Sequence, residues 1–380
     1  MADRNFVNIG TKQRVVFHIP RSIRSEYPNS VFLGAGTFGI VYGLEHKSKN
    51  GNNIAVKQLI RPFENERRAQ RCFRELQLLS EIDHENIIKI KFAYTTDTSI
   101  QSFDSVYFAT DYCGQDLNAI LAQETPEKHS FSLRSFQKII SELLRALKYL
   151  NSANVIHRDL KPDNLAINEN GKLKLLDFGL ARVLDENNQH TNDPGMKYYR
   201  AIETVSFGHS DRQIYNEKAD IWSIGAILCE MLTGSILFKT DPPASDVPII
   251  KALNICGPIP ENVIIEQVDE ERSQKYLRDK STKAVRIDFL GYFREKARPW
   301  LKDDIVREGV SLANFIDGTL EFDHRARMSV EQSLAHPFLA QVRRPLKEVT
   351  ASGTIVDVGY ASISEWKQRV WGFIQNHPIR

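Results

Sequence analysis

The chain has 380 residues, of which 42% are apolar and 26% are charged, and its formal net charge is +2. These values are ordinary for a globular protein with a sizeable core, and they give no global electrostatic reason to expect nucleic acid or a membrane as a partner. The cysteines, which are Cys72, Cys113, Cys229 and Cys256, are widely spaced, so neither a disulfide framework nor a zinc site is expected.

The apolar stretches of the chain are short. The N-terminus carries no apolar run long enough for a signal peptide, and no run approaches the roughly 18 apolar residues that cross a bilayer. The most apolar stretch, Ile221–Leu232, is interrupted by Glu230. We therefore expect a soluble intracellular protein.

Strand-forming runs dominate the first part of the chain. Residues 1–28 form a polar extension with one alternating run, Arg14–Ile19, that is compatible with a strand. A helix over Glu66–Glu81 interrupts the strands that follow. Those strands are expected over Val31–Gly34, Ile40–Glu45, Asn53–Ile60, Ile87–Tyr94 and Ser105–Asp111, with a hairpin turn at Asn50–Asn53.

The pattern becomes helical after about residue 115. Apolar residues recur at i, i+3 and i+4 over Leu133–Leu150, which predicts a long helix with one buried face. Further helices are expected near 217–233, 305–316, 329–335 and 362–375. A small β-rich part followed by a larger helical part predicts an α+β fold with two lobes and a ligand-binding cleft between them. We expect an extension over 1–28, lobes over 29–113 and 114–340, and a second extension over 341–380.

A glycine-rich segment connects two of the predicted strands and resembles the glycine-rich loop of protein kinases. Its glycines would let the backbone approach phosphate groups without Cβ clashes. An ordinary hairpin turn is the alternative for this segment alone, whereas a dinucleotide-binding fold is disfavoured because no helix follows. The residues expected to contact a nucleotide here are Leu33, Gly34, Ala35, Gly36, Thr37, Phe38, Gly39, Ile40 and Val41.

Lys57 follows the apolar residues Ile54, Ala55 and Val56 on a predicted strand. A buried ammonium group requires an anionic partner, which Glu75 on the following helix supplies. The resemblance to kinases implies that Lys57 contacts the α- and β-phosphates of ATP and that Glu75 holds Lys57 in place. A lysine alone on a strand more commonly faces water at a sheet edge, and the linked motifs reverse that expectation.

The stretch His157–Asn164 matches the catalytic loop of protein kinases over eight residues, which is too long a match for chance. Asp159 would accept the proton of a substrate hydroxyl or orient that hydroxyl, and Lys161 would neutralise charge on the transferred phosphoryl group. Asn164 would bind Mg²⁺, together with Asp177 of the Asp-Phe-Gly triplet that follows the predicted strand Leu173–Leu176.

Two further pairings follow from the kinase pattern. Glu203 and Arg327 would form a buried ion pair that braces the substrate loop, in which Ile202 replaces the usual proline. Asp220, at the start of a predicted helix, would cap the backbone of the catalytic loop. The alternative for Asp220 is an ordinary aspartate at a helix start.

From about residue 14 to 375 the chain resembles a mitogen-activated protein kinase of the stress-activated branch. The stretches that carry the resemblance are Leu59–Phe63, Arg74–Leu79, His84–Asn86, Asp116–Asn118, Asn164–Glu169 and Asp177–Arg182. The resemblance implies a serine/threonine kinase of a stress-type cascade that uses ATP and Mg²⁺, phosphorylates protein substrates and is activated by an upstream dual-specificity kinase. It also implies a monomer of the cytoplasm, with the nucleus as a second location.

The resemblance assigns further positions. Thr110 falls at the back of the adenine pocket, Ala55 belongs to the nucleotide site, and Asp116 faces the ribose. Ser364–Lys367 belongs to a C-terminal extension that packs back toward the first lobe. An ATP-binding pseudokinase or scaffold is the main alternative, because Met196 replaces a threonine that usually bonds the catalytic aspartate and lysine.

The activation segment departs from the family pattern. Thr191 keeps the first phosphorylation site, whereas Asp193 replaces the second, a tyrosine, and is either a permanent partial mimic of the phosphate or an unconstrained surface residue. The family's acidic docking patch is replaced by the basic segment 341–348, which puts the usual partner recognition in question. The basic residues expected to receive phosphorylated Thr191 are Arg71, Arg74, Arg158 and Arg182.

Overall fold

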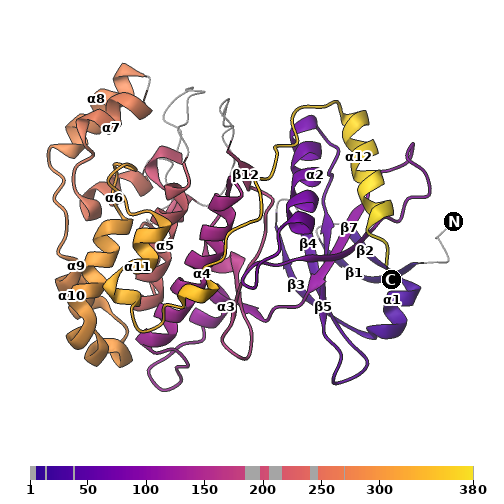
Figure 1. Ribbon diagram of the computed structural model, residues 1–380, viewed down its shortest axis with the longest axis horizontal. Coiled ribbons are helices and arrows are strands. Elements are labelled where there is room, and N and C mark those ends of the chain that lie inside the picture. The colour runs from indigo at the N-terminus through magenta and orange to yellow at the C-terminus, as the bar shows by residue number, and fades with distance from the viewer. Residues whose placement is uncertain are drawn as a thin grey trace. The chain divides into compact units, whose positions relative to one another are not determined.

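The computed structural model describes residues 6–12, 15–36, 39–184, 197–204, 216–239, 247–268 and 270–379. The chain divides into two compact units, of which the first contains Met1–Cys113 and Val358–Arg380 and the second contains Gly114–Asp357. Strands dominate the first unit and helices the second, which confirms the α+β class (Figure 1). Six residues named in the sequence analysis lie outside the described part of the chain: Arg14, Thr37, Phe38, Thr191, Asp193 and Met196.

The first unit is built on an antiparallel sheet of five strands in the order β3-β4-β5-β7-β6. Its strands are β3 (Asn29–Ala35), β4 (Gly39–Glu45), β5 (Ile54–Leu59), β6 (Ile90–Tyr94) and β7 (Val106–Asp111). Each predicted strand is present, and the predicted turn at Asn50–Asn53 joins β4 to β5. All residues of β7 except Asp111 are buried, because this strand has a neighbour on either side.

The N-terminal residues carry more structure than their polar composition predicts. β1 (Phe6–Lys12) and β2 (Val15–Pro20) form an antiparallel hairpin, and α1 (Arg21–Glu26) follows it. Phe17 is fully buried, and its ring centroid lies 4.7 Å from that of Tyr42 and 5.5 Å from that of Tyr107. The predicted strand is therefore present from Val15 onward as β2, and the side chains of Phe17 and Ile19 enter the core of the first unit.

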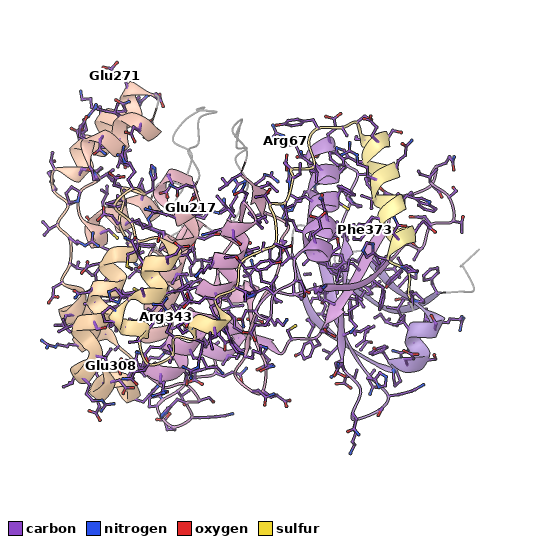
Figure 2. The ribbon with its side chains drawn as sticks, viewed as in Figure 1. Arg67, Glu217, Glu271, Glu308, Arg343 and Phe373 are labelled. Carbon is purple, nitrogen blue, oxygen red and sulfur yellow. The ribbon has the colours of Figure 1, made fainter. Side chains whose placement is uncertain are left out.

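Two helices of the first unit lie side by side (Figure 1). They are α2 (Glu66–Glu81), which matches its predicted bounds, and α12 (Ile363–Asn376). Trp366 of α12 is buried with its ring centroid 5.7 Å from that of Phe73, and the Gln70 side chain donates a hydrogen bond to the Gly359 carbonyl oxygen at 2.6 Å. Figure 2 shows Phe373 farther along α12. The C-terminal segment thus packs on α2, as the tail motif predicts.

The second unit is arranged around α4 (Leu133–Ser152) and α5 (Lys218–Thr233). A capping box between Ser132 and Ser135 fixes the start of α4, and the predicted apolar face of that helix is buried. Nearly all of α5 is buried, which accounts for its apolar sequence. The short strands are β8 (Gln115–Asp116), β9 (Val155–Ile156), β10 (Leu165–Ile167), β11 (Leu173–Leu175) and β12 (Arg182–Val183), in the orders β11-β10-β8 and β12-β9.

The remaining helices of the second unit include two that the periodicity predicts, α10 (Lys302–Thr319) and α11 (Val330–Ala335). The sequence does not predict α3 (Leu117–Leu121), α6 (Val247–Cys256), α7 (Glu261–Gln267), α8 (Glu271–Ser281) or α9 (Phe289–Lys296). The 3₁₀ turns are η1 (Pro162–Asn164), η2 (Lys197–Tyr199), η3 (Ile202–Thr204), η4 (Pro299–Leu301), η5 (Pro337–Leu339) and η6 (Pro345–Lys347). Across the described ranges, no helix combines the length and the apolar character that a membrane span requires.

Candidate active site

Lys57 and Glu75 form an ion pair in the first unit. Lys57 lies on β5 and Glu75 on α2, and the distance between Nζ and Oε1 is 2.5 Å. The Glu75 side chain is 3% exposed and that of Lys57 15%, so water screens their attraction only weakly. The pair that the motif predicts is therefore present, and it holds an ammonium group in a fixed position.

The described residues of the glycine-rich segment lie at the end of β3 and the start of β4, where the Gly36 N–H donates to the Gly39 carbonyl oxygen at 2.9 Å. In the β4–β5 register Val41 pairs with Lys57. A Cβ at Gly39 would lie 2.9 Å from Cε of Lys57 and 3.0 Å from the carbonyl oxygen of Gln58. Glycine at this position therefore lets β4 pass close to the lysine side chain.

The other nucleotide-site candidates of the first unit lie on neighbouring strands. Ala55 of β5 pairs with Thr110 of β7, and Thr110 is buried. Leu33 of β3 is exposed, whereas Ile40 is completely buried in the hydrophobic core. The structure thus assigns Ile40 to packing within the unit, a role that the motif alone does not separate from nucleotide contact.

Asp159, Lys161 and Asn164 meet in the second unit. Oδ2 of Asp159 accepts hydrogen bonds from Nζ of Lys161 at 2.9 Å and from Nδ2 of Asn164 at 3.0 Å. Nδ2 of Asn164 also donates to the Asp159 carbonyl oxygen at 2.7 Å. Within the described ranges no hydrogen bond reaches Oδ1 of Asp159, so this oxygen remains able to accept one.

The Asp-Phe-Gly triplet is tied to the catalytic loop by hydrogen bonds at the residue before it. The Leu176 N–H donates to the Asn164 carbonyl oxygen at 2.9 Å, and Nε2 of His157 lies 2.9 Å from the Leu176 carbonyl oxygen. Because a carbonyl oxygen only accepts, Nε2 of His157 carries a proton. The His157 ring also contacts Phe178 edge to face, with centroids 5.1 Å apart. These contacts fix the backbone on both sides of Asp177.

Asp220 holds the catalytic loop through its backbone. Its carboxylate accepts hydrogen bonds from the N–H groups of His157 and Arg158, both at 2.9 Å. Asp220 is completely buried, which raises its pKa, and the charges and N–H groups of His157 and Arg158 oppose that shift. The predicted cap is present, so the alternative of an ordinary aspartate at a helix start is wrong.

Two residues beside the candidate catalytic groups have left-handed backbone conformations. The φ angle is 67° at Arg158 and 55° at Asp177. Such conformations cost roughly 1–3 kcal/mol each outside glycine, and they persist where surrounding bonds impose them. The hydrogen bond from the Arg158 N–H to Asp220 imposes the conformation of Arg158. The hydrogen bonds of Leu176 fix the backbone immediately before Asp177.

Glu203 and Arg327 form a completely buried ion pair, as predicted. Nη1 of Arg327 lies 2.5 Å from Oε1 of Glu203, and Nη2 lies 3.1 Å from Oε2. Arg327 also donates to the carbonyl oxygens of Glu321 at 2.8 Å and Lys218 at 2.9 Å. The two bonds to Glu203 and the two backbone carbonyl oxygens provide acceptors for the buried guanidinium group of Arg327. Together they connect η3 to the start of α5.

Asp116 caps the start of a short helix in the second unit. Its Oδ1 accepts a hydrogen bond from the Ala119 N–H at 2.7 Å and so caps α3, while its backbone pairs with Ala166 of β10. The cap uses one of the two carboxylate oxygens. The ribose contact that the resemblance implies would have to use the other.

The predicted phosphate-binding arginines are divided between the units. Arg71 and Arg74 lie on α2 in the first unit, and Arg74 is buried. In the second unit Arg182 of β12 pairs with Ile156 of β9, and Ile156 lies two residues before Arg158 in the sequence. The structure therefore brings Arg158 and Arg182 close together, and Arg71 and Arg74 share a helix.

Comparisons with known proteins agree with these motifs. Residues 27–339 match the protein kinase domain family. The chain belongs to the protein kinase family. It is 34% identical to mitogen-activated protein kinase 13 of Mus musculus over 90% of this chain and 87% of that protein, and 34% identical to the Homo sapiens protein of that name over 92% and 89%. Mitogen-activated protein kinase 12 of Danio rerio is 32% identical over 93% of this chain and 90% of that protein.

These similarities confirm the predicted resemblance to the stress-activated branch of the mitogen-activated protein kinases, the two-lobed kinase fold and the assignment as a serine/threonine protein kinase. Neither the match to the kinase domain nor the relatives favour a pseudokinase. Protein kinases as a family use ATP with Mg²⁺.

Asn164 and Asp177 of this kinase carry side-chain oxygen atoms of the kind that bind Mg²⁺. The Asn164 amide nitrogen donates to the carbonyl oxygen and to Oδ2 of Asp159, which turns the amide oxygen away from that residue. Asp177 supplies a carboxylate whose Oδ1 accepts the Gly179 N–H at 3.2 Å. In the described part of the chain no group of three or more His, Cys, Asp or Glu residues could hold a metal alone. Mg²⁺ is commonly bound by one or two protein oxygens together with substrate phosphates, so this donor set fits.

One buried cluster of this kinase is missed by motif analysis. The Tyr199 hydroxyl donates to Oε2 of Glu230 at 2.7 Å, and the Ser223 hydroxyl donates to the Tyr199 carbonyl oxygen at 2.7 Å. Burial raises the pKa of both Glu230 and Tyr199. The cluster ties η2 to α5. The signal in the sequence is Glu230 itself, since a carboxylate inside the most apolar stretch of the chain requires a buried partner.

Proposed function

We propose that this kinase transfers the γ-phosphate of ATP to serine and threonine hydroxyls of proteins, with Asp159 and Lys161 as its catalytic residues. The observation that supports this most directly is the arrangement of Asp159, whose Oδ2 accepts bonds from Lys161 and Asn164 while Oδ1 can still accept a substrate hydroxyl. A carboxylate held in this way orients the nucleophile, and Lys161 neutralises negative charge on the moving phosphoryl group.

The proposal assigns a role to each remaining site residue. Lys57, held by Glu75, contacts the α- and β-phosphates, and Asn164 and Asp177 supply oxygen ligands to Mg²⁺, which would neutralise phosphate charge. The proposed nucleotide contacts are Leu33–Gly39, Val41, Ala55, Thr110 and Asp116, without Ile40, which is buried in the core. We keep the predicted boundaries at 28, 113 and 340 as the proposed division into extensions and lobes.

Metal dependence tests these assignments. We expect the chain to transfer radiolabelled phosphate from ATP to a generic basic protein when Mg²⁺ is present and to stop when EDTA removes the ion. Asp177→Asn should lower the rate by about 100-fold or more, because the replacement keeps the shape and loses the charge that binds the metal. A rate that is unaffected by EDTA, or equal in the variant, would contradict the proposal.

We further propose that an upstream dual-specificity kinase switches this enzyme on by phosphorylating Thr191 alone. A phosphate adds about −1.5 to −2 charges and three acceptor oxygens, which arginines bind well. The adjacent Arg158 and Arg182, and the pair Arg71 and Arg74 on α2, are the proposed receivers. Asp193 would supply a permanent part of the charge that a second phosphate would bring.

The switch is tested with Thr191→Ala beside Asp193→Ala. Treatment with an activating kinase should raise the transfer rate of the unaltered chain and leave the rate of Thr191→Ala at its basal value. Activation of Thr191→Ala to the same rate would show that the switch lies elsewhere.

We also propose that the chain acts on protein substrates as a monomer of the cytoplasm, with the nucleus as a second location.

A further inference from the structure

Two asparagines of this chain are each followed by glycine, and both dipeptides lie in turns between strands. Asn50-Gly51 lies between β4 and β5 in the first unit, and Asn170-Gly171 lies between β10 and β11 in the second. Both asparagines are exposed to solvent. None of the roles assigned to site residues above uses either dipeptide.

An asparagine that precedes glycine can lose its side-chain amide without an enzyme. The backbone nitrogen of the glycine attacks the side-chain carbonyl carbon of the asparagine, and the new C–N bond closes a five-membered succinimide ring. The amide nitrogen leaves as ammonia, with the proton of the glycine N–H. Water then opens one of the two C–N bonds of the ring and leaves aspartate or isoaspartate. Glycine favours the first step because no Cβ shields its nitrogen.

The glycine nitrogen that must attack is engaged in a hydrogen bond in both turns. The Gly51 N–H donates to the Ser48 carbonyl oxygen at 2.9 Å, and the Gly171 N–H donates to the Asn168 carbonyl oxygen at 2.8 Å. Each turn must therefore open before its glycine nitrogen can reach the asparagine side chain. The rate of deamidation then depends on the other bonds that hold each turn closed.

The turn around Asn170 is closed by several further bonds. Oδ1 of Asn168 accepts hydrogen bonds from the N–H groups of Asn170 at 3.0 Å and of Lys172 at 2.9 Å. The Asn168 N–H donates to the Lys172 carbonyl oxygen at 3.1 Å. These bonds hold the backbone on both sides of Asn170.

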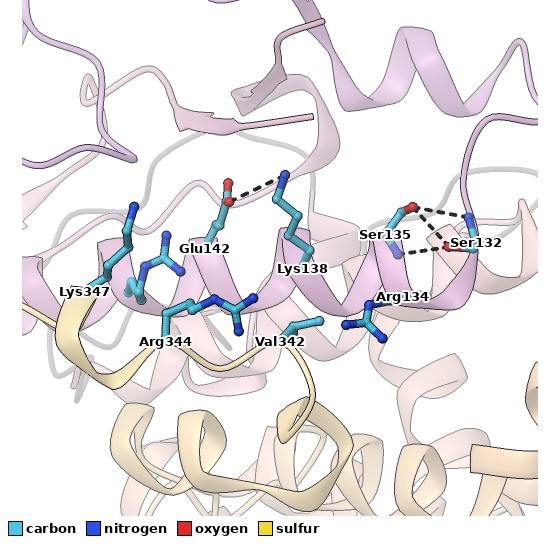
Figure 3. A pocket seen from close by; sticks show the side chains of 9 residues that line it. Ser132, Arg134, Ser135, Lys138, Glu142, Val342, Arg344 and Lys347 are labelled. Atoms are coloured by element: carbon cyan, nitrogen blue, oxygen red, sulfur yellow. Dashed lines mark hydrogen bonds and ion pairs between the residues drawn. The ribbon is translucent and has the colours of Figure 1, made fainter. Parts of the chain in front are cut away.

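Lys138 ties the same turn to α4. Its Nζ donates to the Gly171 carbonyl oxygen at 2.8 Å and lies 3.5 Å from the Asn170 carbonyl oxygen. Lys138 lies at a pocket between α4 and residues 342–347, beside Glu142 (Figure 3). Because α4 is a long and largely buried helix, this turn has a firm anchor outside its own segment.

The turn around Asn50 has no such anchor. The Asn50 N–H reaches Oγ of Ser48 at 3.4 Å, which is a long and weak hydrogen bond. In the described part of the chain, residues 48–52 form no hydrogen bond with any residue outside the segment 46–53. Fewer bonds must break to free the nitrogen of Gly51 than that of Gly171, so the Asn50 turn opens more readily.

Position 51 accepts only glycine in this fold. A Cβ on Gly51 would overlap the imidazole ring of His46, which packs directly against the Gly51 backbone. Substitution of Gly51 would therefore disturb the turn itself, and the experiments below leave this residue in place.

We propose that Asn50 is a site of spontaneous deamidation in the folded chain, with water as the co-reactant, and that the fold protects Asn170 from the same reaction. Deamidation replaces the neutral amide of Asn50 with a carboxylate and so adds a negative charge to the turn between β4 and β5. This proposal concerns the covalent chemistry of the asparagine and does not depend on phosphoryl transfer.

Prolonged incubation of the full chain at mildly alkaline pH tests the proposal. Tandem mass spectrometry of protease digests locates each conversion, and chromatography separates the aspartate and isoaspartate forms. We expect Asn170 to convert at least about tenfold more slowly than Asn50, because more hydrogen bonds must break before its turn opens. In urea the protection is lost, so the two asparagines should convert at similar rates. Asn52 and Asn53, which precede residues with a Cβ, should stay unchanged.

Two variants remove the bonds that protect Asn170. Lys138→Ala removes the anchor on α4, and Asn168→Ala removes the acceptor of two N–H groups. Each should speed the conversion of Asn170 by about threefold or more and leave that of Asn50 unchanged. Lys275→Ala, at an exposed position of α8, should change neither rate. Circular dichroism checks that all three variants are folded.

Three results would overturn the proposal. The first is an equal rate of conversion at Asn50 and Asn170 in the folded chain. The second is the same ratio of rates in the folded chain and in urea, which would show that the sequence alone sets the rates. The third is an unchanged rate at Asn170 in both Lys138→Ala and Asn168→Ala, which would show that these bonds do not protect it.

Discussion

Individual charged residues of this kinase are held in position by a few short hydrogen bonds and ion pairs. Glu75 fixes the ammonium group of Lys57, and two donors occupy one oxygen of Asp159. Motif spacing predicts these partners because each motif places them together. It does not predict the left-handed backbone at Arg158 and Asp177, because φ there follows from bonds made by residues distant in sequence.

The ion pair of Lys57 can be tested at the residue scale with Glu75→Gln. The amide keeps the shape of Glu75 and loses its charge, so the largely buried ammonium group loses its counter-ion. We expect the free energy of unfolding to fall by roughly 1–3 kcal/mol and the affinity for ATP with Mg²⁺ to weaken. Urea unfolding and nucleotide titration measure the two effects.

Glu64→Gln is the matched control for that substitution. Glu64 pairs with Arg61 and Arg68 on the surface, and its side chain is 41% exposed. Exposed ion pairs contribute little, so the control should change the free energy of unfolding by less than about 1 kcal/mol. Equal losses in the two variants would mean that burial of the Lys57 pair adds nothing.

At the scale of elements, periodicity and caps account for most of the helices. The bounds of α2 match the prediction, and in the structure Asn65 caps the start of this helix. The helices α6 to α9 are missed because they are short and their apolar positions follow no long repeat. The hairpin β1–β2 is missed in part because polar residues surround the few that enter the core, such as Phe17 and Ile19.

The packing of α12 on α2 predicts a large effect for Trp366→Ala. The indole is 1% exposed and lies against Phe73, so its loss removes buried apolar surface and leaves a cavity. We expect the free energy of unfolding to fall by about 3–5 kcal/mol in urea titrations. Tyr360→Ala, at a side chain that is 88% exposed, should change it by less than about 0.5 kcal/mol. A Trp366 variant as stable as the Tyr360 variant would show that α12 is not docked.

The link between α4 and the segment before residue 349 predicts a pH dependence. The hydrogen bonds from Arg343, and then those from Lys148, lower the pKa of Glu348 below its ordinary value of 4.5. The folded state thus binds the proton of Glu348 less readily than the unfolded state. Its stabilising contribution is complete above pH 4.5 and is lost as the pH falls through the lowered pKa.

Glu348→Gln should therefore be less stable than the unaltered chain at pH 7, and the difference should shrink toward pH 3.5 in urea titrations followed by tryptophan fluorescence. Glu271→Gln, at an exposed position of α8, should show no comparable difference at either pH. A gap for Glu348→Gln that stays constant with pH would mean that its ionisation is not coupled to folding.

At the scale of the whole molecule, the sequence predicts the kinase architecture better than it predicts surfaces. Motifs along the chain predict Asp159, Lys57 and their partners because the residues of each motif lie within a short stretch of sequence. The pocket between α4 and residues 342–347 escapes the same analysis, since only the fold brings these two segments together. The sequence shows the basic character of segment 341–348 and does not show that α4 lies beside it.

The central claim is that this divergent member of the mitogen-activated protein kinases is an active enzyme whose transfer depends on Asp159. The most direct measurement compares the rate of γ-phosphate transfer by the unaltered chain and by Asp159→Asn, with the affinity for ATP measured on the same samples. The account predicts that the rate falls by about 100-fold or more while the affinity stays within about twofold. Equal rates in the two proteins would contradict it.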